Sequence, residues 1–189
     1  MLIHVRRSIV CGVALALAAT SPLGAQQQTQ PSPMADTIPA NPADVASVDA
    51  IIKSLYDVIS GPAGQARDWK RFRSLFIPGA RLIPTGMRPG GALARVLTPD
   101  DYAIRAGASL EKNGFFEREI SRHADAYGNV MQIFSTYESR RTAADPQPFA
   151  RGINSIQLLK DGNRWWLVTI YWDSERPDNP IPSQFLPHD

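Results

Sequence analysis

The chain has very few side chains that could hold a metal ion or act as a strong nucleophile. Its 189 residues include one cysteine, Cys11, and three histidines. Cys11 lies in an amino-terminal segment that we expect to be removed, so the mature protein would have no thiol for a disulfide, a metal or covalent catalysis. His123 and His188 would then remain, and their spacing fits no zinc site. We therefore expect no bound metal.

Motifs for nucleotide binding and serine hydrolysis are also missing. The sequence contains no Gly-x-Ser-x-Gly elbow, no phosphate-binding loop and no dinucleotide fingerprint. We therefore expect a protein that works without a cofactor.

The mature chain lacks an excess of charge of either sign. Arg6 and Arg7 precede a short apolar run over residues 9–19, and small residues follow up to Ala25, which is typical of a secretory signal cleaved after Ala25. Residues 1–25 carry two of the 20 basic residues and none of the 18 acidic ones, so equal numbers of each remain. The apolar run is too short to span a bilayer as a helix. We expect a secreted or periplasmic protein that binds neither nucleic acid nor, in its mature form, a membrane.

Composition divides the rest of the chain into a linker, one domain and a tail. Residues 26–41 are rich in Gln and Pro, which predicts a flexible linker. The domain is expected over residues 42–176, followed by a Pro-rich carboxy-terminal tail over residues 177–189. A domain of this length can bury a sufficient core without disulfides.

Hydrophobic spacing and capping residues predict three helices in the first half of the domain. The first is expected from residue 42 to residue 59, and the second over residues 68–76. A short strand over residues 81–83 should follow, then a long loop over residues 84–97 with at most a strand near its end. The third helix is expected over residues 98–113, because Thr98 and Asp101 are placed to cap it.

After Gly114 the hydrophobic period changes to two, which predicts strands. Four are expected, over residues 115–126, 129–142, 149–160 and 164–174. Three helices followed by a meander of long strands predict an α+β fold, with the helices packed on one face of an antiparallel sheet.

The last expected strand is apolar on both faces, which is unusual for a sheet with one solvated face. Its two faces carry Trp165, Leu167 and Tyr171 on one side and Trp166, Val168, Ile170 and Trp172 on the other. Either an extra loop of the chain covers the outer face, or a second copy of the protein does. A homodimer is therefore one of two expectations.

The order and sequence of these elements resemble the nuclear transport factor 2-like, or SnoaL-like, superfamily. The resemblance covers about residues 44–174 and is carried by the helices and by the stretches 127–130, 134–139, 151–158 and 165–172. It implies a cystatin-like cone, in which a strongly curved sheet wraps a long helix and encloses an apolar pocket. Members include isomerase-like and dehydratase-like enzymes, polyketide cyclases and many proteins with no known reaction, so the resemblance implies fold better than chemistry.

The isomerase-like members suggest how three catalytic roles would map onto this sequence. They use a tyrosine near the end of the first helix, and Tyr56 occupies a comparable place. A second acid of theirs, which holds the developing oxyanion, falls near Asn154, whose amide can also donate a hydrogen bond. Their carboxylate base has no counterpart, because residues 82–86 contain no acid. This pattern argues against steroid isomerisation by that mechanism.

A polar stripe on the strand 115–126 is the other candidate site. Alternation would place five side chains on one face, namely Glu117, Glu119, Ser121, His123 and Asp125. If this face lines the cone, His123 could act as a base near neutral pH, oriented by a neighbouring carboxylate. If it faces water, the stripe is only a solvated surface, and the buried pattern comes from the opposite face.

These observations leave three classes of function open. The leading expectation is an exported domain whose apolar pocket binds a small apolar or amphipathic molecule, with Trp172, Ile170, Val168, Ile156 and Tyr137 as ligand-binding residues. The second is a cofactor-free lyase or isomerase with His123, Tyr56 and Asn154 as catalytic residues. The third is a non-catalytic dimeric interaction module.

Overall fold

The computed structural model describes residues 37–187. The expected signal segment and residues 26–36 of the expected linker lie outside the described residues. Within residues 37–187, no helix is both long and apolar enough to cross a membrane.

The first expected helix is in fact two helices. They are α1 (Pro42–Val45) and α2 (Val48–Ile59). Ser47 separates them because its backbone is extended and its hydroxyl accepts a hydrogen bond from the backbone N–H of Ala50, which makes it a new N-cap. The apolar spacing continues across the break, so periodicity alone does not reveal it.

The next two helices lie close to where they were expected. The second expected helix is α3 (Trp69–Ser74), which is capped by Asp68 and ends before Phe76. The third is α4 (Pro99–Asn113), where Thr98 and Asp101 form a capping box. Gly114, with a φ of 67°, follows its last residue, as expected for a helix that ends at glycine.

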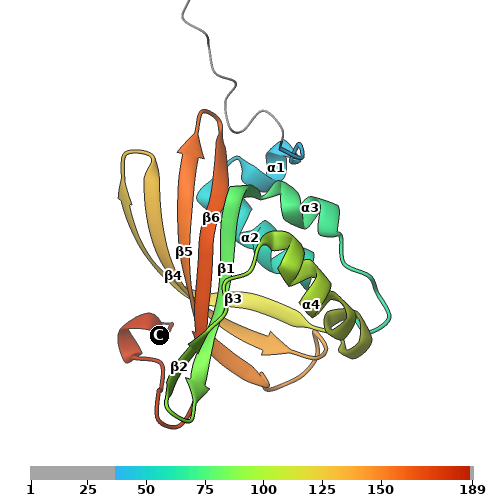
Figure 1. Ribbon diagram of the computed structural model, residues 1–189, viewed down its shortest axis with the longest axis vertical. Coiled ribbons are helices and arrows are strands. Elements are labelled where there is room, and N and C mark those ends of the chain that lie inside the picture. Colours follow the sequence, from blue (N-terminus) through green and yellow to red (C-terminus); the bar gives the residue numbers. More distant parts are fainter. Residues whose placement is uncertain (1–36, 188–189) are drawn as a thin grey trace, which may run out of the picture. The chain divides into compact units, whose positions relative to one another are not determined.

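Six strands form one mixed sheet in the order β2-β1-β6-β5-β4-β3 (Figure 1). Their bounds are β1 Phe76–Arg88, β2 Gly91–Ala94, β3 Phe116–Tyr127, β4 Val130–Arg140, β5 Ala150–Asp161 and β6 Arg164–Ser174. The α+β fold is confirmed, and the four long strands after α4 lie within two residues of their expected bounds. The sheet is not wholly antiparallel, however, because β1 pairs with β6 in parallel.

The first strand is much longer than the three residues expected. β1 continues through Pro84 to Arg88, turns at Pro89 and Gly90, and pairs with β2 as a hairpin. The Pro- and Gly-rich composition that indicated a loop therefore belongs to a strand and its turn, where Gly90 has a φ of 92°.

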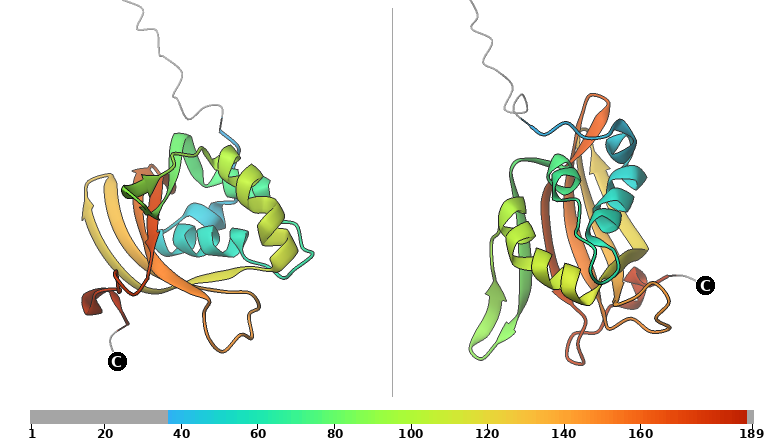
Figure 2. Two further views of the ribbon diagram at one scale, coloured as in Figure 1. Left: turned by 60° about the horizontal axis from the view of Figure 1, so that its bottom comes forward. Right: turned by 90° about the vertical axis from the view of Figure 1, so that its right-hand side faces the viewer.

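The helices cover one face of the sheet, and the core lies between the two layers (Figure 2). Fully buried side chains come from both layers, including Ile51 and Ile52 of α2, Phe72 of α3, Ile133 of β4 and Ile156 of β5. In Figure 2 the long strands bend around α2, in agreement with the expected curved sheet.

Two bulges decide which side chains face this core. In β3, Glu119 pairs with Tyr137 and Ser121 with Thr136, so Ile120 is an extra residue. In β6, Val168 is the extra residue, and Ile156 pairs with Ile170. The expectation that Leu167 and Ile170 point to opposite faces is therefore wrong, since both belong to the core.

The carboxy-terminal segment folds back on the outer face of the sheet. The hydroxyl of Thr136 donates to the carbonyl of Phe185 at 2.6 Å, and the ring of Phe185 lies 5.4 Å from that of Phe134. Ile181 is buried, and its N–H donates to the Glu175 carboxylate at 3.1 Å. Part of the outer face is thus covered by the chain itself, which was one of the two explanations for the apolar last strand.

Candidate functional site

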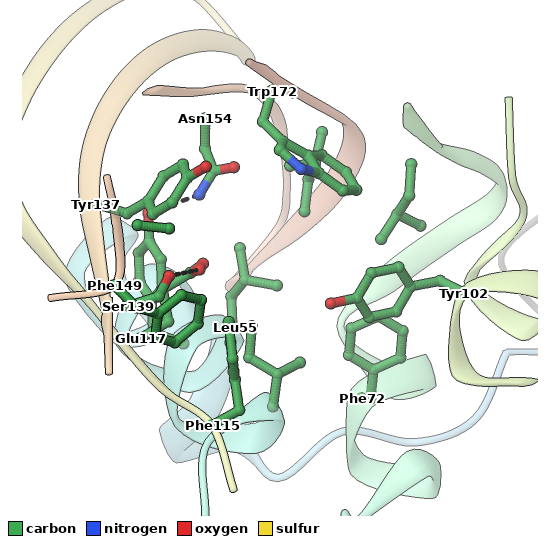
Figure 3. A pocket seen from close by; sticks show the side chains of 15 residues that line it. Leu55, Phe72, Tyr102, Phe115, Glu117, Tyr137, Ser139, Phe149, Asn154 and Trp172 are labelled. Atoms are coloured by element: carbon green, nitrogen blue, oxygen red, sulfur yellow. Dashed lines mark hydrogen bonds between the residues drawn. The ribbon is translucent and has the colours of Figure 1, made fainter. Parts of the chain in front are cut away.

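A cavity of about 210 Å³ lies between the concave face of the sheet and the helices α2, α3 and α4 (Figure 3). Seven of its fifteen lining residues are aromatic. The full set is Leu55, Tyr56, Ile59, Phe72, Leu82, Tyr102, Phe115, Glu117, Tyr137, Ser139, Phe149, Ala150, Asn154, Ile170 and Trp172. Most polar groups gather at one end, around Glu117 and Asn154, and the rest of the wall is largely apolar, with the hydroxyl of Tyr102 as an exception.

The structure brings together five of the eight residues proposed from sequence. Tyr56, Asn154, Tyr137, Ile170 and Trp172 all line the cavity. Two of the expected ligand-binding residues do not: Ile156 is fully buried in the core beneath the cavity, and Val168 is the bulge residue of β6.

His123 lies on the opposite face of the sheet. It pairs with Phe134, its side chain is 65% exposed, and its Nε2 is 3.5 Å from a carboxylate oxygen of Asp125. The bulge at Ile120 is the cause, because it reverses the alternation of β3 and leaves only Glu117 and Glu119 of the expected stripe on the inner side. His123 is therefore too remote to act as a base in this cavity.

A chain of hydrogen bonds runs from the cavity into the protein. The amide of Asn154 donates to the hydroxyl of Tyr56 at 3.0 Å, and this hydroxyl lies 2.7 Å from that of Ser135. Ser135 in turn donates to the carboxylate of Glu119. Because the hydroxyl of Ser135 has one hydrogen, which it donates to Glu119, Tyr56 is the donor in its hydrogen bond with Ser135.

Tyr56 therefore acts on the cavity through Asn154 rather than as a free acid. Its hydroxyl hydrogen is directed to Ser135, away from the cavity. Burial, with the nearby Glu117 carboxylate, raises the pKa of Tyr56 far above its ordinary value. The side chain stays neutral and holds the Asn154 amide in one orientation.

Among the residues that line the cavity, Glu117 is the one whose pKa lies near neutral pH. Burial raises its pKa to about 7, although hydrogen bonds from Ser139 and Asn154 oppose the shift. The hydroxyl of Ser139 donates to its carboxylate at 2.7 Å. Within residues 37–187, no lysine, arginine or histidine forms an ion pair with Glu117.

A polar groove of about 750 Å³ lies on the other side of Tyr56 and Glu117, between α2 and β3. Its arginines are already paired. Arg122 pairs with Glu119 and Asp49, and both Arg118 and Arg140 pair with Glu138. The arginines of the groove are thus compensated, in contrast to Glu117, which lines both the groove and the cavity and has no such partner among the ion pairs of residues 37–187.

Sequence reasoning missed several residues of the wall. Tyr102 comes from α4, and its hydroxyl points into the cavity (Figure 3). Phe115 and Phe149 close another side, with their ring centres 6.2 Å apart, and the guanidinium of Arg141 lies 4.0 Å from the centre of the Phe149 ring. Phe149 was expected to be the first residue of a strand, but it belongs to the connection between β4 and β5, so the alternation of β5 does not indicate its direction.

The cavity wall offers no site for a metal or a phosphate group. The described part of the chain has no cluster of three or more His, Cys, Asp or Glu side chains placed to hold a metal ion. None of the fifteen lining residues is basic. The chemistry available in the wall is therefore that of one carboxyl group, one amide, hydroxyls and aromatic rings.

No protein-family model matches the chain, and no curated protein matches it. Solved structures do match. A protein of unknown function with a cystatin-like fold from Nostoc punctiforme PCC 73102 is 10% identical with a TM-score of 0.52, over 69% of this chain and 90% of that one. A nuclear transport factor 2-like protein of unknown function from Pseudomonas putida KT2440 is 8% identical with a TM-score of 0.52, over 74% of this chain and 94% of that one.

The chain therefore has the nuclear transport factor 2-like, cystatin-like fold, as the sequence resemblance implied. At these identities the likeness concerns the fold alone. Activity has to be argued from the cavity itself.

The substitution Glu117→Gln should change how stability depends on pH. The folded protein keeps the Glu117 proton up to a pKa of about 7, whereas the unfolded chain loses it near the ordinary value of 4.5. Wild-type stability should therefore fall as the pH rises through this window, by up to about 3 kcal/mol relative to the variant, and stay level above it.

Urea denaturation of both proteins across this pH range measures the difference. Glu111→Gln, on the exposed side of α4, is the matched control and should follow the wild-type curve. Parallel curves for wild type and Glu117→Gln would show that the Glu117 carboxyl is not buried in the way described.

Proposed function

We propose that the protein binds a small, largely apolar organic molecule with one polar end in the cavity between its sheet and helices. The proposal rests on how apolar and polar side chains are distributed over the cavity wall. Aromatic and aliphatic side chains make up most of it, and the few polar groups converge at Glu117 and Asn154. Pockets of this composition are typical of small-molecule sites, in which a few polar groups fix the orientation of the ligand.

The size of the cavity limits the ligand to about one or two rings. A cavity of roughly 150 Å³ is enough for benzene, and this one has about 210 Å³. Trp172 and Tyr102 lie at its wall with ring centres 6.2 Å apart, so a flat or ring-containing body would find aromatic surfaces to contact. Mass spectrometry of small molecules that co-purify with the native protein would identify the ligand.

Two neutral probes test the site itself. Propylbenzene and 2-phenylethanol should each bind with a saturable stoichiometry near one per chain, as measured by isothermal titration calorimetry. Ala150→Phe places a ring in the cavity wall and should weaken both by roughly tenfold or more, because it fills space that the probe needs.

Ala126→Phe is the matched control, because Ala126 is exposed on β3 and lines none of the cavities described. It should leave binding of both probes unchanged. Equal binding by the two variants, or no saturable binding by the wild type, would contradict a ligand site in this cavity.

Export from the cytoplasm is the second part of the proposal. It is supported by Arg6 and Arg7, the apolar run after them and the small residues before Ala25. The full chain expressed in a bacterial host should be recovered outside the cytoplasm with Gln26 as its first residue, as read from its intact mass. Cytoplasmic protein that retains residues 1–25 would contradict export.

The homodimer stays a prediction. It is supported by the outer face of β6, where Tyr171 remains 43% exposed even though the carboxy-terminal segment covers part of the sheet. Sedimentation velocity should give twice the monomer mass at micromolar concentration. A monomer throughout the accessible concentration range would overturn this prediction.

A further inference from the structure

The hydrogen atoms at the polar end of the cavity are already committed to partners within the protein. Ser139 donates to Glu117, Asn154 donates to Tyr56, and Tyr56 donates to Ser135. The hydroxyl of Tyr137 lies 3.3 Å from that of Ser174. Once Glu117 is ionised, the groups left for a ligand beside it are acceptors, namely the carboxylate of Glu117 and the carbonyl oxygen of Asn154 on the cavity side (Figure 3). Such an end complements a ligand that brings donors.

The charge at this end is also one-sided. Glu117 is half-buried between the cavity and the polar groove, none of the residues that line the cavity is basic, and no ion pair within residues 37–187 neutralises Glu117. A buried carboxylate without a counter-ion is unfavourable unless the group stays protonated or a cation approaches it. A positively charged ligand would supply the missing partner without breaking an existing pair.

The rest of the wall favours the same kind of ligand. Seven lining residues carry aromatic rings, and the faces of such rings attract ammonium groups through their negative potential. Figure 3 shows Tyr137, Phe149 and Phe115 near Glu117, with Tyr102 and Trp172 across the cavity. One carboxylate among aromatic rings is a suitable site for an amine on an apolar body.

We propose that the ligand is a small hydrophobic amine bound as its cation, with the ammonium group on Glu117 and Asn154 and the apolar body between Leu55, Phe72 and Tyr102. This inference rests on the proposed function and specifies the class of molecule that the cavity takes. Glu117 forms the ion pair, and Tyr56 is a positioning residue that holds Asn154.

Amine binding should depend on the ionisation of Glu117, because the tyrosines that face it are neutral and Glu119 beside it is already paired. Tyr56 of α2, Tyr102 of α4 and Tyr137 of β4 face it, and burial raises the pKa of each, so all three stay neutral. Glu119 follows on the same strand and is paired with Arg122. The other charged side chains of the groove behind Glu117 are Asp49, Lys53, Asp57, Arg118, Arg140 and Asp145.

Three probes of matched size and shape test the inference by calorimetry on the purified protein: 2-phenylethylamine, 2-phenylethanol and propylbenzene. At about pH 8 the amine should bind roughly tenfold tighter than either neutral probe. Its affinity should fall roughly 30-fold between about pH 8 and pH 5.5, because Glu117 gains a proton and loses its charge. The neutral probes should not weaken over this range.

Glu117→Gln should remove both the preference for the amine and its pH dependence, while propylbenzene still binds. Glu111→Gln on the exposed side of α4 is the matched control and should retain both. Near-ultraviolet circular dichroism of each variant checks that the fold is intact.

The outcomes separate this inference from the function on which it rests. Saturable binding of the neutral probes without any preference for the amine would overturn the inference and leave the ligand site standing. Amine binding that survives Glu117→Gln unchanged would also overturn it. Failure of all three probes to bind would overturn the proposed function and the inference together.

Discussion

The arrangement of the cavity depends on one chain of hydrogen bonds, from Asn154 through Tyr56 and Ser135 to Glu119. It joins α2 to three strands, since Asn154 lies on β5, Ser135 on β4 and Glu119 on β3. Each member is a polar group in a largely apolar interior, where an unpaired donor or acceptor costs about 1–3 kcal/mol. These hydrogen bonds therefore fix the position of α2 against the curved sheet. They also fix which atoms of Asn154 face the cavity.

This constraint explains why the two glutamates of β3 behave differently although they are two residues apart. Glu119 accepts hydrogen bonds from Ser135 and Arg122, so its charge is compensated. Glu117 has only neutral partners and lies against aromatic rings, so burial dominates and raises its pKa to about 7. The difference arises from what the neighbouring strands and helix place beside each carboxyl group, and it leaves the cavity with one carboxyl group that has no positively charged partner.

Much of the fold could be predicted from the sequence because its signals are local. The capping residues Thr98 and Asp101 and the terminal Gly114 define α4, and the period-two pattern after it defines β3 to β6. The parallel pairing of β1 with β6 could not be predicted, because it joins segments far apart in the sequence and neither strand encodes its partner. The length of β1 was missed because proline and glycine indicate a turn but not where the turn begins.

Residues of the candidate site could be predicted only where the superfamily resemblance or a regular strand alternation placed their side chains. Tyr56 and Asn154 were found from the superfamily resemblance, and Ile170 and Trp172 from the alternation of the last strand. His123 and Val168 were misplaced by the same alternation, because each lies at or beyond a bulge that shifts the pattern by one residue. Tyr102 and Phe149 line the cavity because of how a helix and a connecting segment pack against the sheet. Hydrophobic periodicity does not predict such packing.

The bulge at Ile120 also has an evolutionary consequence. One residue in β3 determines whether Glu117 shares its face with Ser121 and His123 or is separated from them. An insertion or deletion at this point would change which side chains beyond Ile120 face α2, where Arg122 now lines the polar groove. A change in strand length alone therefore alters the polar groups on the inner side of the sheet, while the architecture itself is shared by proteins as little as 8% identical to this chain.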